Sequence, residues 1–233
     1  MDEADAKALV RRHGWLSTEQ PWLQDAVLSR VRLRSFSPNE FTFHADDDPG
    51  GLYGVVSGGF GTLVPSGGQE MILCHIIRLG VWFGHGPVLT GRSRTISFKA
   101  VERSMALHLP MAAVAEIREM YPEFTLRLGA LSERNYSAVA LKVIGDLLMP
   151  SLDRRIAATL VRISRPEASG EVLPPWPIHA TQAEIGQMAN ASRDRVNRAL
   201  SKFEAKGWIK VEYKVITVRQ LDALATYAAE PGN

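Results

Sequence analysis

Four polar residues in the segment ASRDRVNRALSKF are of the types that read the edges of nucleic-acid bases. They are Arg193, Asp194, Asn197 and Arg198. An arginine can bind the two acceptors of one guanine together, and Asp or Asn can accept from or donate to other base edges. At 100° per residue all four fall within about 140° of one side of a helix, and Val196, Leu200 and Phe203 fall on the other. The pattern predicts a helix with one apolar face and one base-reading face.

The residues before this helix predict a second helix and a tight turn. Thr181 followed by Glu184 is a capping box, which predicts that a helix begins directly after Thr181. Asn190 stands where the chain must turn, and asparagine tolerates the left-handed conformation. Ser192 is a suitable N-cap for the base-reading helix, predicted over 193–204. Two short helices joined in this way are a helix-turn-helix motif.

The residues after the helix favour nucleic acid over the alternative, an ordinary solvated basic helix. Residues 208–211 and 215–218 alternate as a hairpin, which predicts a winged helix. Residues 182–219 carry eight basic and four acidic side chains, a net charge of +4 in a chain whose total is only +2. Positive charge is thus concentrated where phosphate would be bound. The predicted DNA contacts are Ser192, Arg193, Asp194, Asn197, Arg198, Lys202 and Lys210.

Composition narrows the class of protein. With 233 residues the chain can form two domains, and 45% hydrophobic with 22% charged residues is ordinary for a globular protein. One cysteine, Cys74, excludes an internal disulfide framework and a four-cysteine iron–sulfur cluster. The acidic N-terminus is not a secretory signal, and no apolar run is long enough for a membrane span. We therefore expect a cytoplasmic protein with no membrane contact.

The upstream part of the chain changes from helical to β-type periodicity and back. Residues 4–30 are predicted to be helical, and short β-type runs separated by glycine-rich turns fill residues 31–109, which predicts an antiparallel β-barrel or roll. A helix from Pro122 to about Met149 would be near 40 Å long. Because that is more than a small roll can cover, we expect part of its apolar face to meet a second copy, as in a homodimer. The predicted domains are 1–121, 122–150 and 151–233.

This order of elements resembles the Crp/Fnr family of bacterial transcription regulators, which includes the cyclic AMP receptor protein. The segments that carry the resemblance are AEIGQMANASRDRVNRALSKFEAKGWI and GLYGVVSGGFGTLV with GQEMILCHIIRLGVWFG. The implied fold is α+β: an N-terminal antiparallel β-roll of the cyclic-nucleotide-binding type, a long dimerisation helix and a C-terminal winged helix-turn-helix. Arg193, Asp194 and Arg198 match the three main base-contacting positions. The shorter Asp194 replaces a glutamate of the cyclic AMP receptor protein.

The resemblance also implies an effector site. In members that bind cyclic AMP, a Gly-Glu-Leu turn holds the ribose and an Arg-Ser pair binds the cyclic phosphate. Here the turn has His85 in place of the carboxylate, and the adenine-contacting positions near 138–141 are apolar. The implied effector residues are Gly84, His85, Arg94 and Thr95. We expect no cofactor, and an effector other than cyclic AMP or none. The alternatives are a cyclic nucleotide held by Arg94 and Thr95, and a purely structural Arg94 that bonds strand carbonyls.

Partners and rival functions follow from the same comparison. Double-stranded DNA and a second copy are the expected partners. The loop 165–177 corresponds by location to a surface that this family presents to RNA polymerase. Haem on His85 with Cys74 nearby is disfavoured because the ligand positions do not match. An enzyme is disfavoured because the chain lacks a Ser-His-Asp order, a metal-ligand cluster and a phosphate-binding loop. The remaining rival is a small-molecule-binding module that regulates a partner protein.

Overall fold

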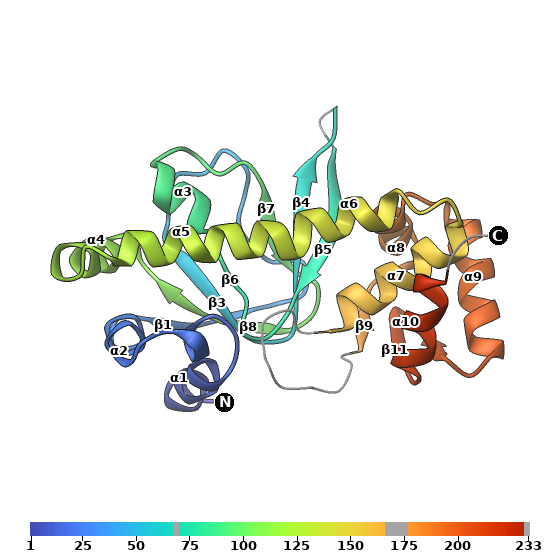
Figure 1. Cartoon of the computed structure of the whole chain (residues 1–233), viewed down its shortest axis with the longest axis horizontal. Helices are drawn as coiled ribbons and strands as arrows, with labels where there is room; N and C mark the ends of the chain where they lie inside the picture. Colours follow the sequence, from blue (N-terminus) through green and yellow to red (C-terminus); the bar gives the residue numbers. More distant parts are fainter. Residues whose placement is uncertain (68–69, 166–176, 231–233) are drawn as a thin grey trace.

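The structure is a computed structural model, and it describes residues 1–67, 70–165 and 177–230. Residues 166–176 of the loop that was expected to face RNA polymerase lie outside the described part of the chain. A β-roll and a winged helix unit lie at opposite ends of the molecule, and a long helix runs beside the roll to the winged helix unit (Figure 1).

The N-terminal region is helical, as predicted, and contains two α-helices separated by a short turn. The helix α1 (Glu3–Arg12) begins at Asp2, whose side chain accepts a hydrogen bond from the backbone N–H of Asp5. A short turn, η1 (Leu16–Thr18), and α2 (Pro21–Leu28) follow. The helix is interrupted because Gly14 has φ of 78° and lies directly against the backbone of Gly80, where a side chain would not fit.

The β-roll consists of two four-stranded sheets in which every paired strand is antiparallel. The first sheet, in spatial order, contains β1 (Arg32–Phe36), β8 (Ser104–Leu109), β3 (Leu52–Ser57) and β6 (Trp82–Phe83). The second contains β2 (Phe41–Phe43), β7 (Ser97–Ala100), β4 (Phe60–Pro65) and β5 (Met71–Ile77). The prediction of an antiparallel roll is confirmed. A short helix, α3 (His85–Thr90), follows β6 where only a turn was predicted.

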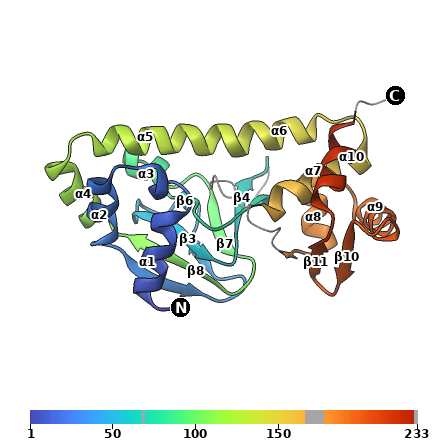
Figure 2. The ribbon, with the colours of Figure 1, turned by 60° about the horizontal axis from the view of Figure 1, so that its bottom comes forward.

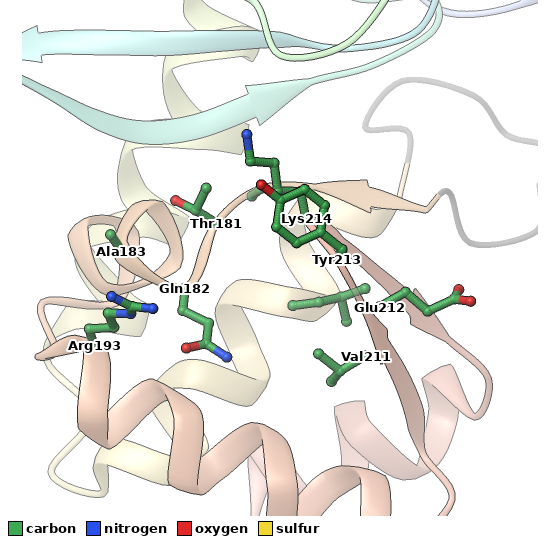
Figure 3. Close-up of a pocket in the computed structure, with 10 residues that line it drawn as sticks. Thr181, Gln182, Ala183, Arg193, Val211, Glu212, Tyr213 and Lys214 are labelled. Atoms are coloured by element: carbon green, nitrogen blue, oxygen red, sulfur yellow. The ribbon is translucent and has the colours of Figure 1, made fainter.

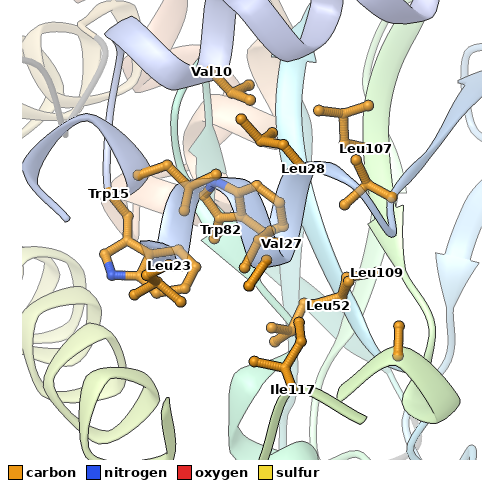
Figure 4. Close-up of a cluster of buried hydrophobic side chains, with 14 of the residues drawn as sticks. Val10, Trp15, Leu23, Val27, Leu28, Leu52, Trp82, Leu107, Leu109 and Ile117 are labelled. Carbon is orange, nitrogen blue, oxygen red and sulfur yellow. The ribbon is translucent and has the colours of Figure 1, made fainter. Parts of the chain in front are cut away.

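The roll has one apolar core between its sheets and another beneath the helices. The first is mainly aromatic and includes Phe43, Phe60, Phe83 and Phe98. The second joins α1, α2 and the first sheet to the helices that follow the roll (Figure 4). At its centre Trp82 is fully buried and packs edge-on against Trp15, with ring centroids 5.7 Å apart. Gly54 is required beside it, because a Cβ at Gly54 would lie 2.5 Å from the indole ring.

The long helix is continuous over 24 residues, but its middle is not α-helical. After α4 (Met111–Met120) it comprises α5 (Phe124–Asn135), the π-helical segment η2 (Tyr136–Leu141) and α6 (Lys142–Leu147). It begins at Phe124 instead of Pro122, because the backbone N–H of Phe124 closes a turn onto the carbonyl of Tyr121. It ends two residues before the predicted Met149.

The winged helix unit follows the long helix. It contains α7 (Leu152–Ser164), β9 (Ile178–His179), α8 (Gln182–Ala189), α9 (Arg193–Ala205), β10 (Ile209–Glu212), β11 (Val215–Val218) and α10 (Leu221–Ala229). The predicted helix-turn-helix and hairpin are confirmed, and β9 adds a third strand beside β11. Turning the molecule shows the wing on the side of the unit away from the long helix (Figure 2). Neither β9 nor α10 was predicted from the sequence.

Candidate nucleic-acid interface and effector site

The two helices of the helix-turn-helix are fixed by local hydrogen bonds and by close packing. The capping box forms as predicted: Glu184 accepts from the backbone N–H of Thr181 at 2.8 Å, and Thr181 accepts from that of Glu184 at 3.1 Å. Asn190 ends α8 in the left-handed conformation, with φ of 47°. Gly186 leaves room for the turn, because a Cβ there would lie 2.5 Å from the carbonyl oxygen of Ala191. Ser192 caps α9 by accepting from the backbone N–H of Arg195.

The faces of α9 are separated as its sequence predicts. Val196, Ala199, Leu200 and Phe203 are buried in the core of the winged helix unit. Arg193, Asp194, Asn197 and Arg198 are exposed, and Ser192 is exposed beside them. Within residues 1–67, 70–165 and 177–230, neither Arg193 nor Arg198 has an ion-pair partner. Both guanidinium groups therefore keep all their donors for a ligand outside the chain.

Three other predicted contact residues are engaged within the chain. Lys202 donates to Asp153 at 2.8 Å and to the hydroxyl of Tyr227 at 3.3 Å, and the bond to Asp153 raises the pKa of Lys202. Lys210 pairs with Glu212 at 2.7 Å on the outer strand of the wing. Asn197 accepts from the side-chain amide of Gln182 at 3.2 Å. All three are exposed, and their present interactions are weak surface contacts. Each would have to exchange that contact to bind a ligand.

Tyr213, at the tip of the wing, was not among the predicted contacts, whereas Lys214 beside it is one of the wing lysines that were expected to bind phosphate. A hollow of about 520 Å³ lies between the N-terminal ends of α8 and α9 and the wing, with Gln182 and Arg193 on one side and Tyr213 and Lys214 on the other (Figure 3). Tyr213 is 87% exposed, and Lys214 occupies the hairpin turn with φ of 59°. The predicted hairpin already placed both at its tip, but the sequence alone did not show that the ring of Tyr213 would be exposed there.

The effector-type residues in the roll are partly brought together. Arg94 is only 2% exposed, its guanidinium carbon lies 3.5 Å from the ring centre of Phe43, and it donates to the carbonyl of Gly51 at 3.3 Å. A Cβ at Gly84 would lie 3.2 Å from Nη1 of Arg94, so the turn and the guanidinium are adjacent. Thr95 is exposed. The bond to the carbonyl of Gly51 is of the kind expected if Arg94 were purely structural. Its Nε and Nη1, however, are buried without a partner among the described residues.

His85 is a neutral hydrogen-bond donor at the same turn. The side-chain nitrogen of Asn135 must donate to the carbonyl of Trp82, 2.8 Å away, so it also donates to Nε2 of His85, 3.1 Å away. The remaining proton of the imidazole therefore lies on Nδ1, which is buried and has no partner in the described residues. Burial lowers the pKa of His85 to about 4, which keeps the ring neutral at pH 7.

The hydrogen-bond donors of Arg94 and His85 can be compared with the groups of a cyclic nucleotide. The free donors of Arg94 suit an anionic group such as a phosphate. The turn supplies the Nδ1 donor of His85 where members that bind cyclic AMP present a carboxylate to the ribose hydroxyl. The residues therefore fit the phosphate of a cyclic nucleotide. They do not fit its ribose hydroxyl, which needs a hydrogen-bond acceptor at this turn.

Neither the thiol of Cys74 nor a cluster of metal ligands adds reactive chemistry to the described part of the chain. The thiol of Cys74 donates to the carbonyl of Thr62 at 3.3 Å, and burial raises its pKa to about 11. It is therefore an unreactive thiol at neutral pH. Among the described residues no group of three His, Cys, Asp or Glu side chains could hold a metal ion. The same residues contain no helix long and apolar enough to cross a bilayer.

Two family models match separate parts of the chain. Residues 33–121 match the cyclic nucleotide-binding domain, and residues 154–227 match the Crp-like helix-turn-helix domain. A CRP-like cAMP-activated global transcriptional regulator of Mycobacterium tuberculosis is 27% identical over 224 residues, which cover 94% of this chain and 98% of the relative. The cAMP-activated global transcriptional regulator CRP of Escherichia coli is 25% identical over 193 residues, covering 82% and 91%.

Solved structures share the fold at lower sequence identity. A putative cAMP-binding regulatory protein from Silicibacter pomeroyi has a TM-score of 0.66 and 18% identity, with 97% of this chain and all of that chain (100%) covered. A CRP-family transcriptional regulator from Thermus thermophilus has a TM-score of 0.65 and 19% identity, with 84% and 97% covered. The order of a β-roll, a long helix and a winged helix is therefore a known architecture.

Replacing His85 by glutamine is expected to flatten the pH dependence of stability between about pH 4 and pH 6.5. Below pH 6.5 the unfolded chain binds a proton on His85 that the folded chain does not bind, because burial lowers the folded-state pKa to about 4. The contribution of His85 is complete above pH 6.5 and falls by roughly 3 kcal/mol as the pH drops to 4. Urea denaturation across this range measures the difference.

The exposed His44 provides the matched control, His44→Gln, for loss of an imidazole. Some slope should remain in His85→Gln, because burial also lowers the pKa of His108. Identical slopes for the wild-type chain and His85→Gln would show that the imidazole of His85 is not held neutral by the fold.

Proposed function

Because the chain belongs to the Crp/Fnr family of DNA-binding transcription regulators, we propose that it reads a palindromic operator as a homodimer and does so without cyclic AMP. The observation that carries the proposal is the exposed face of α9, where Arg193 and Arg198 have no ion-pair partner within the described residues. A polar face of this kind gains its hydrogen bonds when it enters a major groove. The two matched domains and the curated relatives are those of regulators and not of enzymes.

Each side chain of this face has a chemical role in the proposal. Arg193 and Arg198 read guanines through O6 and N7, and Asp194 accepts from a cytosine amine. Ser192 and Asn197 lie at the edge of the same face and make the adjoining polar contacts. The lysines bind phosphate: Lys210 and Lys214 from the wing, and Lys202 from the far end of α9. The wing and the helix would then hold the duplex on both sides of the hollow in Figure 3.

The homodimer is supported by apolar side chains that the chain itself leaves uncovered on the long helix and at its C-cap, Leu148. Leu126 is 74% exposed, and Leu141, Ile144 and Leu148 are 57%, 50% and 77% exposed. An exposed apolar series of this length on one helix is typical of a protein–protein contact. A second copy is the proposed partner, because it presents the same apolar series. Two inverted half-sites also require two recognition helices about 34 Å apart.

Independence from cyclic AMP is supported by the donors at the effector turn. The M. tuberculosis and E. coli relatives are described as cAMP-activated. In this chain the turn offers the Nδ1 donor of His85, and the cation of Arg94 remains for an anion. The effector is therefore either absent or an anion other than cyclic AMP. We further propose that the chain works in the cytoplasm, where the DNA lies, and contacts RNA polymerase through residues near 165–177.

Replacing Arg198 by alanine is expected to relax base preference at one operator position by about 1–3 kcal/mol, because a bidentate contact to guanine is lost. Lys210→Ala should instead weaken binding to all sequences alike and reduce the salt dependence, because its contact is to phosphate. Fluorescence anisotropy with single-base operator variants at several salt concentrations measures both effects. An unchanged base preference in Arg198→Ala would refute the assigned base contact.

Placing aspartates at Ile144 and Leu148 together is expected to convert the dimer to a monomer, because two charges would be buried at the helix contact. Light scattering after size exclusion measures the mass. Lys142→Asp changes the charge of another exposed residue on the same helix and serves as the control, with the dimer retained. A wild-type chain that is monomeric at micromolar concentration would contradict the homodimer directly.

Selection from a random duplex pool, with and without cyclic AMP, is expected to enrich the same palindrome in both arms. The physical reason is the missing ribose acceptor at the turn that holds His85. Recovery of a palindrome only in the cyclic AMP arm would refute independence from the nucleotide and would make Arg94 and Thr95 its phosphate site. Enrichment in neither arm would contradict the proposed operator reading by the free chain.

A further inference from the structure

The winged helix unit is packed directly onto the roll through α7 and β5. Leu73 and Ile76 of β5 belong to the same buried cluster as Ile156, Leu160 and Ile163 of α7. The backbone N–H of Leu73 also donates to the side chain of Gln187 on α8, at 3.3 Å. Apolar contact of this kind is non-directional, so hydrogen bonds beside it restrict the angle between the two bodies more narrowly than the contact does alone.

Arg162 adds direction to this contact from the side of the winged helix unit. It lies in the last turn of α7 and is 2% exposed. Its Nε donates to Asp146 of α6 at 2.7 Å, and its Nη1 lies 3.1 Å from the carbonyl of Cys74 and 2.9 Å from Nδ1 of His75, both on β5. One guanidinium therefore joins the winged helix unit, the long helix and the roll.

Arg78 makes the reciprocal connection from the side of the roll. It follows β5 and is 1% exposed. Its Nε donates to the carbonyl of Ile163 at 3.3 Å and its Nη2 to the carbonyl of Pro177 at 3.0 Å, so it binds both the end of α7 and the approach to β9. Glu102 accepts from its Nη1 and also lies 3.3 Å from His179 of β9. The two arginines thus cross the same boundary in opposite directions.

Stability alone does not account for charges in this position. Burying an ion pair costs desolvation free energy that its attraction seldom exceeds, and apolar side chains of similar volume usually hold an interface as well. The guanidinium groups instead restrict orientation, because their planar N–H donors form hydrogen bonds only over a narrow range of angles. Since α7 packs on both α8 and α9, fixing α7 also fixes the direction in which the base-reading face points.

We propose that Arg162 and Arg78 are positioning residues for operator reading: they set the angle of the winged helix unit on the long helix and roll, and thereby the half-site spacing that a dimer accepts. The inference rests on the proposed function, because spacing has meaning only for two half-sites. It assigns the two arginines no contact with DNA. The bond from Arg162 to Asp146 is the central one, because it connects α7, on which α9 packs, to the helix on which the two copies are proposed to meet.

The test replaces the central pair by apolar residues in the full-length chain, Arg162→Met with Asp146→Leu. Half-sites selected by the wild-type chain are placed at the wild-type spacing and at spacings one base pair shorter and longer, and affinities are measured by fluorescence anisotropy. The variant should fold with unchanged or higher Tm and keep the half-site sequence. Its preference for the wild-type spacing should fall roughly tenfold, because directional bonds are replaced by non-directional contact.

Two further variants keep the test decisive. Arg162→Lys keeps the charge and loses the planar fork, so it should broaden the accepted spacing even if the apolar double variant does not fold. Arg154→Met removes an arginine from the same helix whose partner, Glu230, lies within the winged helix unit, and it should leave the spacing preference unchanged.

The outcomes separate this inference from the proposed function. Unchanged spacing preference in folded Arg162 variants that still bind the half-site would overturn the positioning role and leave operator reading intact. Failure of the wild-type chain to select any half-site would overturn operator reading, and the positioning role with it. A broadened spacing in Arg154→Met as well would show a general loosening of α7 and would also contradict the assignment.

Discussion

Burial of positive charge is the constraint on which the arrangement of this molecule depends. Arg78, Arg94 and Arg162 are each at most 2% exposed. A buried guanidinium must find acceptors, and the side on which it finds them decides its role. Arg78 and Arg162 find carbonyls and carboxylates across the boundary between the roll and the winged helix unit. Arg94 finds one carbonyl and an aromatic face and keeps two unpartnered nitrogens among the described residues, whereas Arg162 keeps one.

The winged helix could be predicted because its signals are local. A capping box spans four residues, the turn needs one left-handed residue, and the faces of α9 follow from helical periodicity alone. The boundary between the domains offered no such signal. The bond from Arg162 to Cys74 spans 88 residues of sequence, and that from Arg78 to Pro177 spans 99. Neither arginine stands in a pattern that differs from an ordinary surface residue.

The candidate effector residues were named by resemblance, but their chemistry required the structure. These residues are close in sequence, and two similarities were sufficient to name them: Gly84 to the family's turn, and Arg94 with Thr95 to its Arg-Ser pair. Which nitrogen of His85 carries the proton depends on Asn135, which lies 50 residues away on the long helix. The same limit applies to β9, since two residues are too few for a periodic pattern and become a strand only by pairing with β11.

The π-helical segment at Tyr136–Leu141 divides the long helix into two halves that are out of phase. Such a segment accommodates one more residue per turn than the α-helix, so a count of positions made from one end does not carry over to the other. In the first half Leu128 and Leu131 face the roll, and in the second half Ile144 and Leu148 are exposed. Deleting one residue here would turn the far half by about 100° with every other residue unchanged. The number of residues in this segment therefore sets the orientation of the winged helix unit relative to the roll.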